Sequence, residues 1–327
     1  HRDLHRVDRR QRQMCIRDSI DIVALARSLE LDIAIDLGGY TLNARSEIFA
    51  LSAAPIQISY IGYLGTMGAN HYDYIIADQT IIPEKNQKYY SEKIAYLPSY
   101  QVNNSKEEIP DTFFTRDDLG LPEDGFVFCC FNNTFKITPA TFDSWARILS
   151  EVEGSVLLIY ADNDTAKINL TKEIVARGIH SDRLIFGERL PKIEYMARYR
   201  AADLFLDTHP YNAGTTASDA LRMGVPVLTF LGSSFASRMA ASILNALNLP
   251  ELVKGTQKEY ESFAIELATD PEKFKVIKDK LDNNLSTALL YDSPLFTRHL
   301  ESAYTQMHKN FHQGLDPEHI YVEQAKN

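Results

Sequence analysis

The segment Asp207–Asp219 has the composition of a phosphate-binding loop, since it joins an apolar strand to a helix through small and hydroxyl-bearing residues. After Gly214, a helix is predicted to begin at Thr215 or Thr216. The first turn of a helix presents unpaired N–H donors and the positive end of the helix dipole, which together bind phosphate, and the two threonine hydroxyls add donors. Alternatively, Thr216 and Asp219 form an ordinary capping box. Both hold if one threonine caps the helix and the other binds the anion.

Lys136 lies in a second such loop, which follows the apolar run 126–131 and ends at Thr138 and Pro139. Threonine followed by proline is a good N-cap and N1 pair, so a helix is predicted to begin there, with Lys136 just before it. Open parallel sheets bind ligands beyond the carboxyl ends of their strands, where such loops lie. An ammonium there can neutralise a phosphate that gains charge as a bond breaks. The alternative is an ordinary solvated surface lysine.

Lys192, Tyr195 and Arg198 follow one another at intervals of three residues, so a helix places them on one face. The tyrosine ring could stack on a nucleobase, with the two cations nearby. The alternative is the polar face of an ordinary amphipathic surface helix, which is the default interpretation of such a pattern.

The remaining candidates for chemistry are weaker. Asp162, Asn163 and Asp164 could hold a divalent metal against a diphosphate, but the same residues are favoured in turns and N-caps, and we prefer that interpretation. His71 and His209 are general bases by type, yet neither has a carboxylate nearby in sequence to orient it. No metal site is therefore predicted, and no general base is assigned.

The overall composition argues against several classes of protein. The chain has 327 residues, 45% of them hydrophobic, which is enough to bury one large core or two ordinary ones. Its net charge of −10 argues against binding to nucleic acid through bulk charge. No apolar run approaches the ~20 residues that cross a bilayer, so no membrane partner is expected. Three cysteines without zinc spacing fit a reducing, cytoplasmic setting.

Residues 1–18 differ from the rest of the chain. They contain six Arg and three Asp with almost no apolar periodicity, so their charge is opposite in sign to that of the body. One interpretation is a basic arm for an acidic partner. We favour the other, that the segment is not native, because the string RQMCIRDS resembles a translated sequencing adapter. The native protein is then expected to extend upstream.

Strands and helices alternate along the rest of the chain, which predicts parallel sheets covered by crossover helices. A polar segment, 106–125, is interpreted as a linker between a partial first lobe at 19–105 and a second lobe at 126–285. Residues 286–327 form a helical tail. The most economical α/β architecture is two doubly wound, Rossmann-like lobes with a cleft between them. The first lobe is predicted to be incomplete because it is about half as long as the second.

The elements of each lobe are predicted from short apolar runs and from helical periodicity. The first lobe begins with a helix at 20–29 and has strands at 32–37, 56–61 and 74–77. In the second lobe the predicted strands are 126–131, 156–160, 183–186, 203–207 and 225–230, and the predicted helices are 139–152, 165–177, 192–202, 216–223 and 234–247. The tail has an apolar helical face made of Phe296, Leu300, Tyr304, Met307 and Phe311.

Four strings carry a resemblance to a known family: DLFLDTHPYNAGTTASDALRMGVPVLTFLGSSFASRMAASIL, FCCFNNTFKITPATFDSWARIL, LGGYTLNARSEIFALSAAPIQISYIGYLGTMGANHYDYIIAD and YYSEKIAYLP. They resemble the catalytic region of the O-linked N-acetylglucosamine transferase and SPINDLY family, in its bacterial branch, from about Asp32 to Val253. The family implies a GT-B architecture of two Rossmann-like lobes and inverting transfer that needs neither a metal nor a cofactor. Its members transfer N-acetylglucosamine from UDP, or fucose from GDP, to Ser or Thr of proteins.

The resemblance also implies roles for individual residues. Lys136 matches the lysine that steadies the departing diphosphate, Thr215 and Thr216 match threonines on the diphosphate, and Asp219 matches a carboxylate that holds the ribose hydroxyls. Lys192 and Arg198 match contacts to the donor nucleotide. The remaining positions expected around the donor are Asn133, Tyr195 near the base, Tyr211 and Gly214, with Gly62 and Leu64 lining the sugar pocket from the first lobe.

Two departures from the family pattern qualify these expectations. Gly214 stands where bacterial members usually have His, and the family's proposed base histidines precede the part of the first lobe found here. The tetratricopeptide repeats that usually recruit protein acceptors are not in this sequence either. We expect a fragment of a cytoplasmic protein O-glycosyltransferase that uses UDP-N-acetylglucosamine. The alternatives are a nucleotide-sugar 2-epimerase of the same architecture and a fragment that binds the donor without catalysis.

Overall fold

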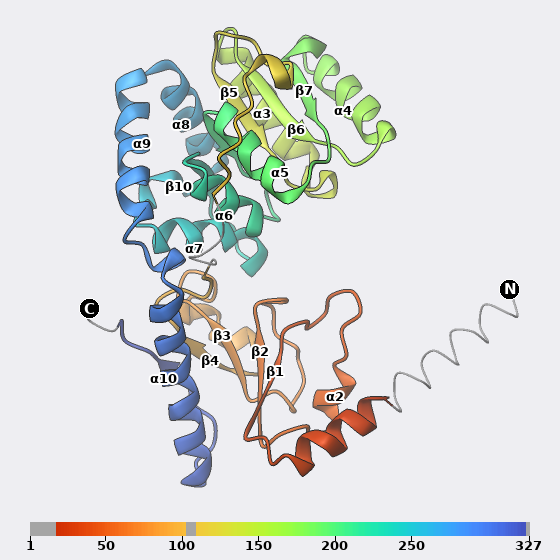
Figure 1. Ribbon diagram of the computed structural model, residues 1–327, viewed down its shortest axis with the longest axis vertical. Coiled ribbons are helices and arrows are strands. Elements are labelled where there is room, and N and C mark those ends of the chain that lie inside the picture. The colour runs from red at the N-terminus through yellow and green to blue at the C-terminus, as the bar shows by residue number, and fades with distance from the viewer. Residues whose placement is uncertain (1–17, 103–108, 325–327) are drawn as a thin grey trace, which may run out of the picture. The chain divides into compact units, whose positions relative to one another are not determined.

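The computed structural model describes residues 18–102 and 109–324, which divide into two compact units. Unit 1 contains the chain up to Gln101 together with Pro294 onward, and unit 2 is Val102–Ser293. Each unit is an α/β structure built on one parallel sheet (Figure 1). The two predicted α/β lobes are therefore confirmed. The predicted N-terminal arm, apart from Asp18, lies outside the described residues.

Unit 1 has a five-stranded sheet in the order β1-β2-β3-β4-β11, and every neighbouring pair is parallel. The predicted first-lobe strands agree with the structure to within one residue at either end, and every residue of β2 and β3 is buried. Residues 18–28 are helical. The strands are β1 (Ile33–Asp36), β2 (Ile56–Tyr60), β3 (Tyr74–Ala77), β4 (Lys93–Tyr96) and β11 (Ile320–Tyr321), and two further α-helices are α2 (Glu47–Ala50) and α10 (Ser293–His312).

The C-terminal segment belongs to unit 1, so the predicted division into a separate tail at 286–327 differs from the structure. Strand β11 extends the sheet beside β4, with Ile320 opposite Ala95. Helix α10 packs on the same unit, where the ring of Phe296 stacks on Tyr60 of β2 with the centroids 6.4 Å apart. The apolar face of α10 was recognised in sequence, but pattern alone could not show which sheet buries it.

Unit 2 has a six-stranded parallel sheet in the order β10-β9-β8-β5-β6-β7. Its strands are β5 (Val127–Cys130), β6 (Val156–Tyr160), β7 (Leu184–Gly187), β8 (Leu204–Leu206), β9 (Val227–Phe230) and β10 (Val253–Lys254). Its α-helices are α3 (Pro139–Glu151), α4 (Asp164–Ala176), α5 (Lys192–Arg198), α6 (Thr215–Arg222), α7 (Met239–Ala246), α8 (Gln257–Thr269) and α9 (Pro271–Leu285).

Two helix starts follow the predicted capping chemistry. The Thr138 hydroxyl accepts the Thr141 N–H, and Pro139 occupies the first position of α3. The Asn163 side chain accepts the Ala166 N–H at 2.8 Å and so caps α4, which confirms the interpretation of residues 162–164 as a turn and cap. The predicted helix at 234–247 begins later, at Met239, because a 3-10 turn with its own capping box precedes it.

The described part of the predicted linker packs against unit 2. Arg116 donates to the Gly125 carbonyl at 2.8 Å and forms an ion pair of 3.1 Å with Asp203, directly before β8. Arg200 donates to the carbonyl of Pro110 at 2.6 Å. Residues 109–125 are therefore a surface segment of unit 2, held there by Arg116 and Arg200. The polar composition of the segment predicted a linker but did not indicate these contacts.

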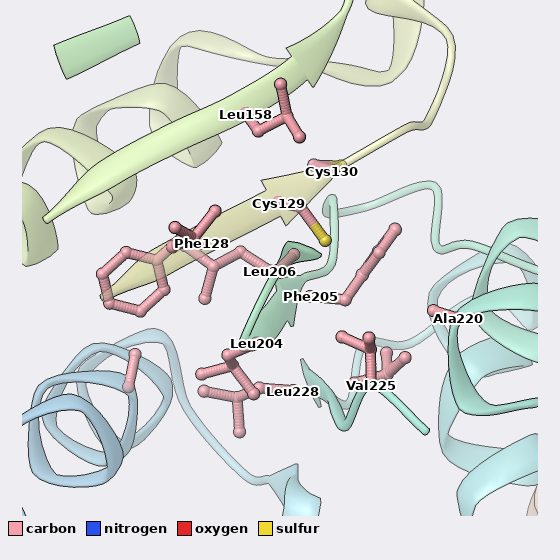
Figure 2. Packing of buried hydrophobic residues seen from close by; sticks show 14 of the residues in the cluster. Phe128, Cys129, Cys130, Leu158, Leu204, Phe205, Leu206, Ala220, Val225 and Leu228 are labelled. Atoms are coloured by element: carbon pink, nitrogen blue, oxygen red, sulfur yellow. The ribbon is translucent and has the colours of Figure 1, made fainter. Parts of the chain in front are cut away.

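The core of unit 2 is formed by β5, β8 and their neighbours (Figure 2). Cys129 of β5 lies beside Phe205 of β8 on one face of the sheet, and Phe128 lies beside Leu204 on the other; all four side chains are fully buried. Cys129 and Cys130 are packing residues as expected, and burial raises the pKa of both thiols. Within the described ranges, none of the helices combines the length and the apolar character that a membrane span requires.

Replacing Ile159 with Ala should lower the free energy of unfolding of unit 2 by about 2 to 5 kcal/mol, because the side chain is 0% exposed and its removal leaves a cavity. The matched control is Ile168→Ala, at a position 54% exposed in the same unit, where we expect a change within about 0.5 kcal/mol. Urea titration followed by the fluorescence of Trp145, the single tryptophan, reports on unit 2 alone. Equal losses in the two variants would contradict this packing.

Candidate functional site

The strand order of unit 2 brings two sequence-distant loops together. The chain runs from β5 to β6 and β7 on one side, then returns to place β8 and β9 on the other side of β5. The loops after β5 and β8 therefore leave the same edge of the sheet in opposite directions. This is the topological switch point, where open parallel sheets bind their ligands. Lys136 lies in the first loop and residues 207–214 form the second.

Lys136 is held against the second loop. Its Nζ donates to the carbonyl oxygen of Asn212 at 3.0 Å and lies 3.8 Å from the ring centroid of Tyr211. The side chain is half-buried, and burial lowers its pKa, while the nearby Asp207 carboxylate acts in the opposite direction. Lys136 is therefore positioned by the fold and is not an ordinary solvated surface lysine.

Asp207 is the buried carboxylate from which the second loop begins. The sequence analysis did not select it as a functional residue. One carboxylate oxygen accepts the N–H of Thr208 at 2.8 Å and of Ala213 at 2.7 Å, and the other accepts the Thr229 hydroxyl at 2.7 Å. Burial raises its pKa to about 7, against the effect of these donors and of Lys136. An acidic residue that ends an apolar strand was the signal that could have identified it.

Thr216 connects the two loops through Asn132. The threonine hydroxyl donates to the Asn132 side-chain oxygen, and the Asn132 amide donates to the Thr208 hydroxyl at 2.8 Å. Among the described residues no side chain caps the start of α6, whose N-cap is Gly214. The capping box proposed for Thr216 and Asp219 is therefore not formed. Thr215 is exposed at this uncapped helix start, which suits an anion.

Asp219 lies one turn further along α6 and pairs with Lys192 at the start of α5. Lys192 Nζ is 3.0 Å from both carboxylate oxygens. The carboxylate is buried, whereas the lysine side chain is half exposed. The pair joins α5 to α6 at the edge of the loop cluster and leaves the lysine accessible from solvent.

Tyr195 continues this network from α5. Its hydroxyl lies 2.7 Å from that of Tyr199, which in turn donates to the carbonyl oxygen of Thr216 at 3.1 Å. The side chain is half-buried, and burial raises its pKa. The ring meets Phe131 edge-on, with the centroids 6.2 Å apart. Tyr195 is thus fixed beside the helix start that carries Thr215 and Thr216.

Arg198, which the resemblance assigns to a contact with the donor nucleotide, is 1% exposed. Its guanidinium lies 4.0 Å from the ring centroid of Phe131 and donates to the carbonyl oxygen of Glu188 at 2.7 Å. Within the described part of the chain its Nε is buried without a hydrogen-bond partner. Arg198 therefore holds the loop between β7 and α5 in place.

The other residues predicted to bind the nucleotide-sugar donor come from several separate segments. Asn133 and Tyr211 are exposed on the two loops, and Gly214 is the N-cap of α6. Gly62 and Leu64 belong to unit 1, in the loop after β2. A side chain at Gly62 would come within 2.1 Å of the Leu37 carbonyl oxygen, so this position accepts only glycine.

Among the residues that the structure describes, no carboxylate orients either histidine considered as a base. His209 stacks on Phe230 with the ring centroids 4.2 Å apart, and burial lowers its pKa. Its Nε2 is buried without a hydrogen-bond partner among the residues described. His71 packs against Tyr72. The structure gives no reason to assign either as the base.

Comparison with known proteins gives a match over most of the chain. The sequence matches glycosyl transferase family 41 over residues 23–109 and 100–300. A probable UDP-N-acetylglucosamine–peptide N-acetylglucosaminyltransferase, SEC of Arabidopsis thaliana, is 35% identical over 90% of this chain and 31% of its own length. The Caenorhabditis elegans UDP-N-acetylglucosamine–peptide N-acetylglucosaminyltransferase is 28% identical over 89% of this chain and 35% of its own. The chain spans about a third of the length of these relatives.

Solved structures give a consistent picture. A mutant O-GlcNAc transferase of Thermobaculum terrenum matches with a TM-score of 0.84 at 31% identity, over 90% of this chain and 56% of that one. The fold is therefore GT-B-like. A putative UDP-N-acetylglucosamine 2-epimerase of Listeria monocytogenes matches with a TM-score of 0.51 at 18% identity over 94% of this chain and 82% of that one, a likeness that concerns the fold alone.

The raised pKa of Asp207 predicts how stability depends on pH. An unfolded Asp titrates near ~3.9, so between that value and about 7 the folded protein holds a proton that the unfolded chain has released. The contribution of Asp207 to the free energy of unfolding is therefore complete below pH ~4 and is lost as the pH rises to about 7. Between pH 5 and pH 8 the wild type should lose stability relative to Asp207→Asn, which keeps one oxygen for Thr208 and Ala213.

The measurement is urea unfolding followed by Trp145 fluorescence at several pH values in both proteins. Trp145 suits it because its Nε1 donates to the Tyr260 hydroxyl, which donates to the Asp207 carbonyl oxygen. Parallel pH profiles for wild type and variant would show that Asp207 does not titrate in this range.

Proposed function

The chain belongs to glycosyl transferase family 41, and on this basis we propose that it is part of an inverting, metal-independent protein O-glycosyltransferase that transfers N-acetylglucosamine from UDP to Ser or Thr hydroxyls. The names of the relatives reported above describe transfer of N-acetylglucosamine from UDP-N-acetylglucosamine to peptide. The observation that best supports the proposal is the contact of Lys136 Nζ with the Asn212 carbonyl, because it joins a cation to the loop that leads into the uncapped start of α6.

The diphosphate of the donor would bind at this junction. The first N–H groups of α6 and the exposed Thr215 hydroxyl can donate to phosphate oxygens, and the helix dipole favours negative charge there. Thr216 holds the loops in register through Asn132 and can exchange that bond for one to phosphate. Lys136 supplies the full positive charge. Asn133, Tyr211 and Gly214 border the same junction and complete its donor-facing surface.

The nucleoside would bind along α5 and α6. The buried Asp219 carboxylate can accept hydrogen bonds from the ribose hydroxyls, beside its half-exposed partner Lys192. We assign the ring of Tyr195, on α5, to a contact with the base. Arg198 acts indirectly, by holding the loop before α5 through Glu188. We assign Gly62 and Leu64 of unit 1 to the sugar pocket on the family resemblance alone.

In the reaction, the acceptor hydroxyl attacks the anomeric carbon of the sugar while the bond from that carbon to the diphosphate breaks. Negative charge then accumulates on the leaving diphosphate. Lys136 and the amide and hydroxyl groups at the start of α6 are positioned before the reaction to stabilise that charge, which is worth most when the donors need not reorganise. The base that takes the acceptor's proton is not among the residues assigned here.

The remaining parts of the proposal concern the whole protein. We infer a cytoplasmic location because Cys129 and Cys130 are reduced thiols in the core. The acceptor is a protein, in accord with the peptide substrates in the relatives' names. On the family resemblance, tetratricopeptide repeats in a longer parent chain would recruit that acceptor.

Replacing Lys136 with Met in the longer parent enzyme should lower the rate of transfer by about 10² to 10³, because one preorganised contact to the leaving group is lost. Affinity for UDP should fall by less, since the lysine acts mainly on charge that develops during the reaction. The control is Lys167→Met, which removes a lysine of α4 that pairs with Asp164. Transfer rates and UDP calorimetry would be compared, and equal losses in the two quantities would count against the assigned role.

Separate sites for ribose and diphosphate predict that two variants of this chain behave differently. Thr215→Val should weaken the binding of both UDP and inorganic pyrophosphate, because it removes a donor to phosphate. Asp219→Asn should weaken the binding of UDP and leave pyrophosphate unaffected. Thr171→Val, whose hydroxyl bonds within α4, is the matched control. Calorimetry in which Asp219→Asn weakens both ligands alike would contradict the ribose assignment.

A further inference from the structure

Three side chains of the types that bind metal ions meet in unit 1, and none of them is assigned to the donor. Asp32 directly precedes β1, and His308 and His312 lie near the end of α10. His308 Nε2 is 2.9 Å from His312 Nε2 and 3.7 Å from the nearer Asp32 oxygen. The three ligand atoms all lie within 4.8 Å of one another.

The sequence and the fold both contribute to this cluster. Histidines four residues apart share one face of a helix, so α10 itself brings their rings together, with centroids 4.2 Å apart. Asp32 comes from the N-terminal part of the chain, directly before β1. It lies close to the two histidines because α10 packs on the sheet to which β1 belongs. Ligands of parallel sheets bind at the carboxyl ends of the strands, whereas Asp32 is at the amino end of β1.

The spacing suits a coordinated ion. Two ligands at about 2.0 to 2.1 Å from a metal, separated by 90 to 109°, lie roughly 2.9 to 3.4 Å apart, and the two Nε2 atoms already meet this condition. A modest rotation of the Asp32 side chain, which is 65% exposed, would complete a set of three. His308 is 45% exposed, so an ion can enter from solvent.

We propose that Asp32, His308 and His312 bind a divalent transition-metal ion of the zinc class. Two imidazole nitrogens and one carboxylate suit Zn²⁺, Co²⁺ or Ni²⁺, whereas Mg²⁺ and Ca²⁺ prefer oxygen ligands. The ion would link the end of α10 to the start of β1, two segments that are far apart in sequence. An ion that binds the native but not the unfolded protein stabilises the native one.

The site also leaves room for further ligands. Asp32 and His312 line a cavity of about 470 Å³ together with Arg27, Ser52 and Phe311. Three protein ligands leave at least one position of a four-coordinate zinc ion open, and water can fill it from this cavity. Phe311 was predicted on the apolar face of α10, yet its ring is exposed. The ring forms part of the cavity wall.

Titration calorimetry with Zn²⁺ on the chelator-treated chain tests the site. We expect the double variant His308→Gln/His312→Gln to lose one bound equivalent relative to the wild type, and Asp32→Asn to lower the affinity at least about tenfold. The matched control is His180→Gln, because His180 is an exposed histidine paired with one carboxylate, Asp182, in unit 2. His1, His5 and Cys15, which lie outside the described residues, remain in every variant and so cancel from the comparison.

Two further measurements check that the lost equivalent belongs to this site. Co²⁺ should give a visible absorption band in the wild type that is lost in the double variant. Zn²⁺ should raise the thermal midpoint of the wild type more than that of the double variant, as followed by calorimetry, while Mg²⁺ should leave both unchanged. Equal Zn²⁺ stoichiometry and affinity in the wild type and the double variant would overturn the proposal.

Discussion

The loop cluster of unit 2 proposed to bind the donor depends on one buried carboxylate. Asp207 ends β8 inside the protein, where an acidic group must be surrounded by donors, and it obtains them from both ends of the loop that follows and from Thr229 of β9. These bonds fold residues 208–213 back over the strand end. The carbonyl of Asn212 then meets Lys136, so the placement of the lysine follows from the need to satisfy Asp207.

The same network explains why no side chain in the described part of the chain caps the start of α6. Thr216 and Asp219 have the spacing of a capping box, but Asn132 of the neighbouring loop takes the threonine hydroxyl and Lys192 of α5 takes the carboxylate. The helix N-terminus is thereby left to an external anion. Contacts with a neighbouring loop and helix thus prevent the capping box that the local sequence favours. The N–H groups at the helix start are then suited to a diphosphate.

Unit 1 is organised by a different constraint, the completion of its sheet by a distant part of the chain. The last strand, β11, and the helix α10 come from the C-terminus, yet they pack on β4 and on Tyr60 of β2. That return of the chain also brings His308 and His312 to Asp32. A sequence motif cannot reveal such a cluster, because Asp32 and the two histidines lie some 280 residues apart. The sequence patterns predicted the C-terminal segment as a separate tail.

The sequence by itself determined most of the strands and helices, because period-two and period-3.6 patterns and caps such as Thr138 and Asn163 act over a few residues. It also carried the family resemblance and the selection of Lys136, Thr215 and Asp219. Tertiary structure alone decided that Arg198 is buried, that Asp207 supports the loop, and that residues 109–125 pack on unit 2. These outcomes depend on which polar atoms meet across loops distant in sequence, and no local pattern contains that information.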